Sequence, residues 1–230
     1  MAFDIKKIIS KNRLIHNFVS FIVNLTPDFI EHNFSKYKNL RNCILNLNYD
    51  KIEGDYVEFG CFSGASLNHS IKTHLKFSRS YKKEKNFLNR KFYGLDSFSG
   101  FPEEIHDEFK TENFLSDINF VKKLEKKYSC CQIVKGFFSE SLKSDQMKKI
   151  SKISLAFIDC DLYSSSKDVF DYIKNRLTDG AFVVIDDYYS LDYNKNSIHK
   201  ALSENIDLKN KLIHIKSYGL NGMIFRYIND

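Results

Sequence analysis

Proline and glycine are scarce in this chain, which contains two prolines and nine glycines among 230 residues. Stretches rich in these residues commonly link separate domains, so their scarcity argues against several domains. No internal repeat or low-complexity tract is present either. The length is sufficient for one large α/β domain with its own core. We therefore expect one main domain at residues 49–230, preceded by an N-terminal helical extension at residues 1–48.

Long apolar runs are also absent. No run approaches the roughly 20 residues that a helix needs to span a bilayer. The apolar stretch at residues 18–25 is short, contains Ser20 and Asn24, and is not followed by a small-residue cleavage site. These features predict neither a membrane span nor a signal peptide, and we expect a cytoplasmic protein.

Cysteine and histidine show no metal-binding pattern. The five cysteines are odd in number and lack the spacing of zinc ligands, and the seven histidines show no ligand pair. We expect the cysteines to be reduced and to lie in or near the core, as free cysteines commonly do. A zinc site is therefore not predicted.

The net charge of +6 is not concentrated in a basic patch of the sequence. The lysine runs at residues 82–85 and 122–127 are interleaved with glutamate, and no arginine-rich helix or aromatic stacking motif accompanies them. Such interleaving is typical of a solvated surface. We therefore predict no nucleic-acid partner.

The hydrophobic pattern divides the chain into a helical part and a part in which strands and helices alternate. From residue 4 to about residue 48, apolar residues recur at helical spacing in three stretches, and Pro27 opens the second. Strands are predicted in the runs 55–60, 91–96, 132–136, 157–163, 182–188, 211–218 and 223–228. Helices are predicted between them at residues 64–75, 114–127, 142–149, 165–177 and 196–205. Asp179-Gly180 is expected to end the helix at 165–177, and residues 79–90 are expected to form a loop.

This order of elements predicts a doubly wound, mostly parallel α/β sheet. The last two strands are joined by the Gly-rich turn at residues 219–222, which predicts an antiparallel hairpin at one edge. In such sheets, ligands bind at the carboxyl ends of the strands. We therefore expect the functional residues at the points where the predicted strands end.

Four aspartates end two of the predicted strands. Asp159 and Asp161 follow one strand, and Asp186 and Asp187 follow the strand that comes after the next helix. Carboxylates gathered at one edge repel one another, so a cation, a proton or a basic substrate is expected among them. Three of them, Asp159, Asp186 and Asp187, suit a hard cation such as Mg²⁺, and Asp161 could act as a base or an outer ligand. A simpler alternative is that Asp186 or Asp187 caps a turn.

The first two strands also end in residues that suit a ligand. Gly60 and Gly64 follow the first strand, but their spacing differs from the G-x-G-x-x-G of dinucleotide sites, and Glu58 would repel a phosphate. An acidic residue suits an amine-bearing ligand, such as the amino-acid end of S-adenosylmethionine, although an ordinary strand-to-helix turn is an equally good interpretation. Asp96 ends the second strand, where a ribose-binding carboxylate is expected, with a helix or turn cap as the alternative.

These segments together resemble the macrocin O-methyltransferase (TylF-type) family. The matching segments occur in family order between about residues 36 and 205, at 54–60, 93–102, 135–142, 158–168 and 180–188. The resemblance implies a Rossmann-like class I methyltransferase domain that transfers a methyl group from S-adenosylmethionine to a sugar hydroxyl with the help of Mg²⁺. The acceptor-contacting lid segments of the family correspond to the N-terminal extension, where this chain matches only loosely. The acceptor, a small molecule or a glycan, is therefore left open.

The resemblance also implies a role for each matched residue. The residues that would frame the methionine part of the cofactor are Glu58, Gly60, Gly64 and Ser66. The ribose and adenosine would lie beside Asp96, Ser97 and Phe98. The adenine would be bordered by Gly136, Phe137, Phe138 and Ser139. Mg²⁺ would be held by Asp159, Asp186 and Asp187, and the general base would be Asp159 or Asp161.

Two other functions remain open at this point. The Asp159-Cys160-Asp161 sequence also fits the Asp-x-Asp motif with which many glycosyltransferases hold a metal and a nucleotide-sugar diphosphate. A non-catalytic nucleotide-binding module is the third interpretation. Against glycosyl transfer, Glu58 lies in the first turn and a second aspartate pair ends the next strand. The aromatic N-terminal helices suggest that the protein forms a homodimer.

Overall fold

The structure is a computed structural model that describes residues 12–80, 89–103 and 110–229. Its centre is a seven-stranded sheet with the order β3-β2-β1-β4-β5-β7-β6. The strands are β1 (Asp55–Phe59), β2 (Phe92–Asp96), β3 (Cys131–Lys135), β4 (Ile153–Ile158), β5 (Leu177–Ile185), β6 (Leu212–Tyr218) and β7 (Gly222–Tyr227). Strands β1 to β5 run parallel, whereas β7 runs antiparallel to both β5 and β6. The predicted doubly wound sheet with an antiparallel C-terminal hairpin is confirmed.

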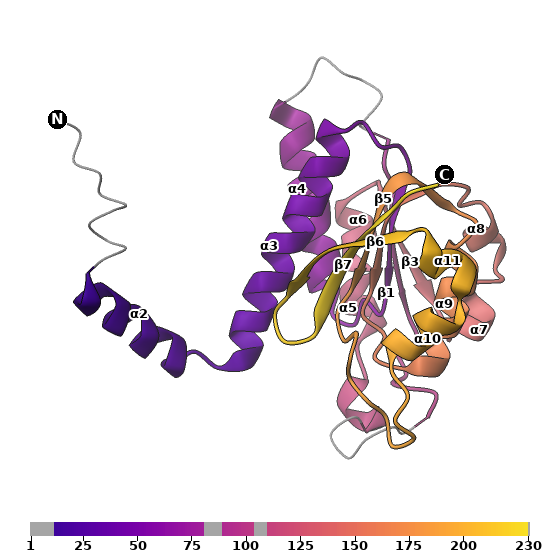
Figure 1. Cartoon of the computed structure of the whole chain (residues 1–230). Helices are drawn as coiled ribbons and strands as arrows, with labels where there is room; N and C mark the ends of the chain where they lie inside the picture. The colour runs from indigo at the N-terminus through magenta and orange to yellow at the C-terminus, as the bar shows by residue number, and fades with distance from the viewer. Residues whose placement is uncertain (1–11, 81–88, 104–109, 230) are drawn as a thin grey trace.

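Helices cover both faces of this sheet (Figure 1). The longer ones are α2 (Arg13–Leu25), α3 (Asp28–Tyr49), α4 (Ala65–Ser80), α9 (Tyr163–Ile173) and α10 (Ile198–Glu204). The shorter ones are η2 (Thr111–Phe114), α5 (Ile118–Val121), α6 (Lys123–Lys127), α7 (Phe138–Ser141), α8 (Asp145–Lys148) and α11 (Ile206–Asn210). Helices α3 and α4 lie on one side of the sheet, and α9, α10 and α11 lie on the other. Within the described ranges, no helix is both long and apolar enough to cross a membrane.

Several predicted boundaries were wrong. The second and third N-terminal stretches form one helix, α3, which begins directly after Pro27 as expected. The single helix predicted at 114–127 is divided among η2, α5 and α6, and the helix predicted at 142–149 is shorter, as α8. Helix α4 continues to Ser80, and residues 81–88 of the predicted loop lie outside the described residues.

The Asp179-Gly180 pair, expected to end a helix, lies inside strand β5. Helix α9 ends earlier, at Ile173, and Leu177 already pairs with Ile153 of β4. The next pairing joins Leu155 to Phe182, so β5 accommodates extra residues where Gly180 has a φ of 80°. The Asp-Gly signal therefore marks an irregularity in a strand, because Gly tolerates the left-handed conformation that such a bulge requires.

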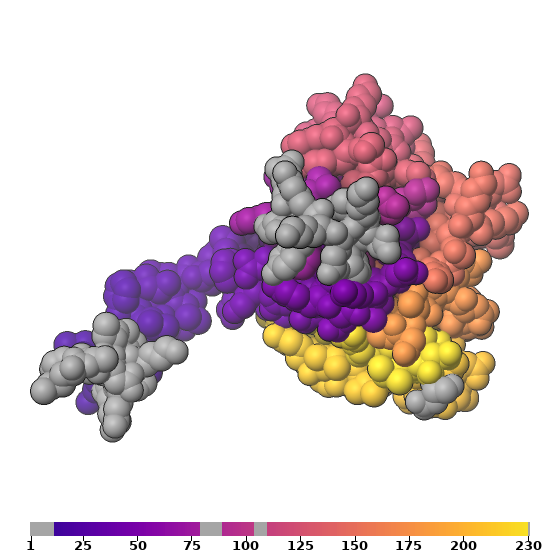
Figure 2. Space-filling view, turned by 90° about the horizontal axis from the view of Figure 1, so that it is seen from above, coloured from indigo at the N-terminus to yellow at the C-terminus, as the bar shows by residue number. Residues whose placement is uncertain are grey.

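The core lies on both faces of the sheet, as a parallel sheet requires. Every residue of β4 is buried, and β1 is buried from Tyr56 to Phe59. The second half of α3 belongs to this core, since Leu40, Ile44 and Leu47 are buried. Helix α2 has no buried residue and extends away from the sheet (Figure 2). The N-terminal extension thus contains one half that packs on the domain and one half that does not.

Candidate active site

A cavity of about 740 Å³ opens at the carboxyl ends of the parallel strands. The first half of α3 forms one wall, and the loops after β1, β2, β3, β4 and β5 and the β6–β7 turn form the remainder. This is the edge at which ligands bind in doubly wound sheets, because the strand order reverses between β1 and β4. Its lining includes Asp28, Phe29, His32, Lys36, Gly60, Asp96, Ser97, Gly136, Phe137, Phe138, Asp159, Asp161, Asp186, Asp187 and Leu220.

Gly60 allows the ends of β1 and β4 to approach each other. Its φ is +91°, a conformation that residues with a side chain rarely adopt. A Cβ atom at this position would lie 1.8 Å from the backbone oxygen of Asp159. Glycine is therefore required where the predicted cofactor-binding turn meets the first acidic strand end.

Asp96 is held by backbone hydrogen bonds and faces the cavity. Its Oδ2 accepts from the Phe62 N–H and its Oδ1 accepts from the Phe98 N–H, both at 2.8 Å. Each carboxylate oxygen can accept a second hydrogen bond. Asp96 therefore retains acceptors for the hydroxyls of a ribose, and the cavity that it lines has room for a nucleoside.

Glu58 does not line the cavity. Its side chain is fully buried, and its two oxygens accept hydrogen bonds from the Tyr56 and Ser66 hydroxyls. Burial raises the pKa of Glu58 to about 7, although these two hydrogen bonds act to lower it. Gly64 would meet the side chains of Val121 and Leu124 if it carried a Cβ. Of the four residues expected around the methionine part, the cavity lining includes Gly60.

The other predicted cofactor residues divide in the same way. Ser97, Gly136, Phe137 and Phe138 line the cavity. Phe98 is buried and contributes its backbone N–H to Asp96. Ser139 lies on α7 next to the lining residue Phe138. The ends of β2 and β3 thus supply one carboxylate and two aromatic rings to the cavity, which fits a nucleoside in both polarity and shape.

The four predicted aspartates converge, but they form two groups. Carboxylate oxygens of Asp159, Asp161 and Asp187 lie within 4.8 Å of one another. Such an all-oxygen donor set suits Mg²⁺. Asp161 adopts a φ of 58°, a conformation that a non-glycine residue holds only when its surroundings enforce it. Burial and the adjacent Asp187 carboxylate raise the pKa of Asp161 well above its ordinary value.

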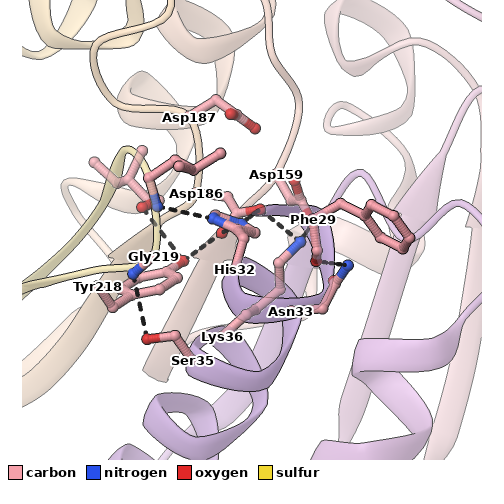
Figure 3. A network of polar contacts seen from close by, with 12 residues as sticks. Phe29, His32, Asn33, Ser35, Lys36, Asp159, Asp186, Asp187, Tyr218 and Gly219 are labelled. Atoms are coloured by element: carbon pink, nitrogen blue, oxygen red, sulfur yellow. Dashed lines mark hydrogen bonds and ion pairs between the residues drawn. The ribbon is translucent and has the colours of Figure 1, made fainter. Parts of the chain in front are cut away.

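Asp186 forms a separate network with α3 and β6 (Figure 3). Its two oxygens each lie 3.1 Å from His32 Nε2, and the Tyr218 hydroxyl donates to Oδ1 at 2.6 Å. Lys36 Nζ lies 2.5 Å from Asp186 Oδ2 and 3.2 Å from Asp159 Oδ2. Burial by itself would raise the pKa of Asp186, but the His32 hydrogen bond and the Lys36 charge lower it to about 2.

The backbone of the β6–β7 turn fixes the orientation of His32. The Leu220 N–H donates to His32 Nδ1 at 3.2 Å, so the hydrogen of the neutral ring lies on Nε2 and points at Asp186. One turn further along α3, Ser35 Oγ accepts from the Gly219 N–H at 3.2 Å. These contacts connect α3 to both the hairpin and the acidic edge.

Sequence reasoning missed His32, Lys36 and Tyr218 as site residues. His32 and Lys36 are four residues apart on one helix, a spacing that places two side chains on the same face. That spacing was the available signal, and it is weak, because nothing in the sequence indicates which edge of the sheet the face contacts. Tyr218 was predicted only as the end of a hairpin strand.

The fold defines the class of the protein. The sheet order and the antiparallel hairpin are those of the class I methyltransferase fold. The solved structure of the O-methyltransferase NovP has a TM-score of 0.66 at 18% identity, covering 84% of this chain and 79% of that one. At this identity the similarity establishes the fold alone.

Comparison of sequences then identifies the family. The model of the family described as Macrocin-O-methyltransferase (TylF) matches residues 34–223, so this chain belongs to that family. One relative, the mycinamicin III 3''-O-methyltransferase of Micromonospora griseorubida, is 23% identical over 66% of this chain. Another, an 8-demethyl-8-(2,3-dimethoxy-alpha-L-rhamnosyl)-tetracenomycin-C 4'-O-methyltransferase of Streptomyces olivaceus, is 27% identical over 70%. The matched region spans 62% of the length of each of these relatives.

Proposed function

We propose that the protein is an S-adenosylmethionine- and Mg²⁺-dependent O-methyltransferase that acts on a hydroxyl of a sugar. The observation that carries this proposal is the continuity of the cavity, in which Asp96 lines one part and the four aspartates line another. A methyl donor and an acceptor oxygen could therefore meet within one cavity. The names of the two relatives describe O-methyltransferases, and one of them includes a rhamnosyl group, which supports a sugar acceptor.

The proposed roles combine the contacts described above with the roles that the family resemblance implies. Asp96 would accept hydrogen bonds from the ribose of the cofactor, and Asp159, Asp186 and Asp187 would hold Mg²⁺. Bound Mg²⁺ would supply Lewis-acid polarisation of the acceptor hydroxyl. Asp159 would receive the proton of that hydroxyl, because burial and the neighbouring Asp186 raise the pKa of its carboxyl group well above the ordinary value and make its carboxylate a stronger base. The first half of α3 would act as a lid over the acceptor, because it forms one wall of the cavity.

Titration calorimetry with S-adenosylhomocysteine tests the proposed class of enzyme. We expect S-adenosylhomocysteine to bind, because Asp96 offers acceptors to a ribose beside aromatic side chains, and we expect no binding of UDP. Asp96→Asn is expected to weaken S-adenosylhomocysteine binding about tenfold, as one charge-assisted acceptor becomes an amide. Binding of UDP without S-adenosylhomocysteine would instead favour the metal-dependent glycosyltransferase. If neither ligand binds, the methyltransferase proposal is contradicted and the glycosyltransferase gains no support.

We also propose that the protein forms a homodimer through helix α2. Phe18, Phe21 and Leu25 of α2 are 58–65% exposed, and Phe29 and Phe34 continue the apolar surface onto α3. The four phenylalanines alone expose about 500 Å², and a standard interface buries about 800 Å² per partner, so the neighbouring aliphatic side chains bring this surface into the range of a stable dimer. Helix α2 contains one arginine and no lysine, whereas anionic lipid surfaces recruit clusters of basic residues.

Light scattering coupled to size-exclusion chromatography tests this interface. The chain mass is 27.0 kDa, and we expect the wild-type protein to elute at twice that mass. Phe18→Ser combined with Phe21→Ser should yield a monomer, whereas Asn17→Ser on the polar side of α2 should leave the dimer intact. A wild-type monomer at micromolar concentration would contradict the proposal. A cytoplasmic location and the identity of the acceptor stay predictions from the sequence.

A further inference from the structure

Lys36 occupies the space between two of the clustered aspartates. Its ammonium group lies 3.2 Å from Asp159 Oδ2 and 2.5 Å from Asp186 Oδ2, and its side chain is 13% exposed. The lysine belongs to α3, whereas the two aspartates follow β4 and β5 (Figure 3). A cation from the N-terminal helix therefore bridges two neighbouring strand ends, at the edge where the carboxylates concentrate.

We propose that the Lys36 ammonium competes with the divalent cation for the carboxylates of Asp159 and Asp186. The inference rests on the proposed metal site and concerns what controls its occupancy. In this arrangement, all the acceptor positions of the Asp186 carboxylate are occupied. His32 and Tyr218 contact Oδ1, and His32 and Lys36 contact Oδ2, which accounts for about four acceptor positions of a carboxylate.

The spacing of the other carboxylates is consistent with this competition. Among the described residues, the candidate metal group consists of Asp159, Asp161 and Asp187, and it leaves out Asp186. The set predicted from the sequence contains Asp186 in place of Asp161. With Lys36 in place, Asp186 is neutralised by an internal cation and is not offered to a metal. Withdrawal of Lys36 would free an acceptor position on Oδ2 of Asp159 and one on Oδ2 of Asp186, while His32 and Tyr218 would still hold Asp186.

Electrostatics makes the two cations mutually exclusive. An ammonium and a divalent ion on the same pair of carboxylates would be only a few ångströms apart. Asp186 and Lys36 are largely shielded from water, so their interactions are screened little by salt. Because Lys36 and His32 lie on the half of α3 that lines the cavity, metal binding would be coupled to the position of this helix.

Titration of Mn²⁺ into the full-length protein tests the competition. We expect Lys36→Met to bind Mn²⁺ at least tenfold more tightly than the wild type, because the competing charge is gone and the carboxylates remain. Lys36→Arg should stay close to the wild type, since it retains the charge. Lys38→Met, which removes the same charge from an exposed position of the same helix, should leave Mn²⁺ affinity within twofold.

Thermal unfolding provides a second readout in case Lys36→Met folds poorly. Without metal, Lys36→Met and Lys36→Gln should melt below the wild type, because Asp159 and Asp186 lose their counter-ion. Saturating Mn²⁺ should raise the melting temperature of both variants by more than it raises that of the wild type. Equal or weaker Mn²⁺ binding by Lys36→Met, or an equal Mn²⁺-induced rise, would overturn the proposal. S-adenosylhomocysteine binding measured on the same samples reports separately on the proposed methyltransferase function.

Discussion

Asp159→Asn is expected to lower kcat for methyl transfer by about 1,000-fold, in the range of a lost general base, while S-adenosylhomocysteine affinity stays within about threefold. Asp159 is the aspartate that joins the two groups in the acidic cluster. It contributes to the carboxylate set with Asp161 and Asp187, and it also contacts Lys36. An amide at this position can neither accept the hydroxyl proton nor provide the charge that a hard cation needs.

Asp161→Asn serves as the matched comparison, because both residues follow β4 and both were candidates for the base. Burial and Asp187 raise the pKa of Asp161, and no cation opposes them among its main influences. Asp161 is therefore expected to be protonated in the metal-free protein and to donate a hydrogen bond to Asp187. An asparagine retains a donor there, so we expect Asp161→Asn to keep kcat within about tenfold.

Transfer of a labelled methyl group to a panel of sugar-bearing acceptors measures both variants, and calorimetry with S-adenosylhomocysteine measures the cofactor site. Equal losses in the two variants would show that Asp161 shares the role of base or metal ligand. A loss of S-adenosylhomocysteine affinity in Asp159→Asn would show that its effect is a structural one, transmitted through the contact between the Asp159 backbone and Gly60.

The architecture could be predicted from the sequence because local patterns determine it. Strand β4 is a continuous apolar run that is buried along its whole length, and parallel strands buried on both faces have this composition. The order of strands and helices then restricts the topology to a doubly wound sheet. The predicted ends of helices and strands were wrong where the same local residues are compatible with two structures. Asp179-Gly180 suits both a helix end and a bulge, and pairing of Leu177 with Ile153 decides between them.

The acidic edge of the site was predictable for the same reason, since parallel strands bring their carboxyl ends together. The residues that contact Asp186 could not be predicted from the sequence. His32 and Lys36 are separated from it by about 150 residues, and their contact depends on how α3 packs across the domain. The burial of Glu58 could not be predicted either. Its hydrogen-bond partners Tyr56 and Ser66 lie near it in the sequence, but no sequence pattern marks such a cluster. Residues brought together by tertiary packing are those that sequence patterns do not reveal.

Glu58→Gln is expected to make the protein progressively more stable than the wild type as the pH rises from 4.5 to 7.5. The pKa of Glu58 is raised from 4.5 to about 7 by burial, so the folded protein holds a proton that the unfolded chain releases within this window. Below pH 4.5 both states are protonated and the wild type bears no penalty. Above pH 7 the folded state must bury a charged carboxylate, at a cost of about 3 kcal/mol.

Glutamine has no proton to release and can still form hydrogen bonds with Tyr56 and Ser66. The stability difference between Glu58→Gln and the wild type should therefore increase by about 3 kcal/mol across the window, whatever constant offset the amide introduces. Urea unfolding at several pH values, without S-adenosylmethionine or metal, measures this difference, and the other titrating groups cancel between the two proteins. Glu112→Gln removes an exposed carboxylate and should stay within about 0.5 kcal/mol of the wild type throughout. A pH-independent difference for Glu58→Gln would show that the pKa of Glu58 is not raised in the folded protein.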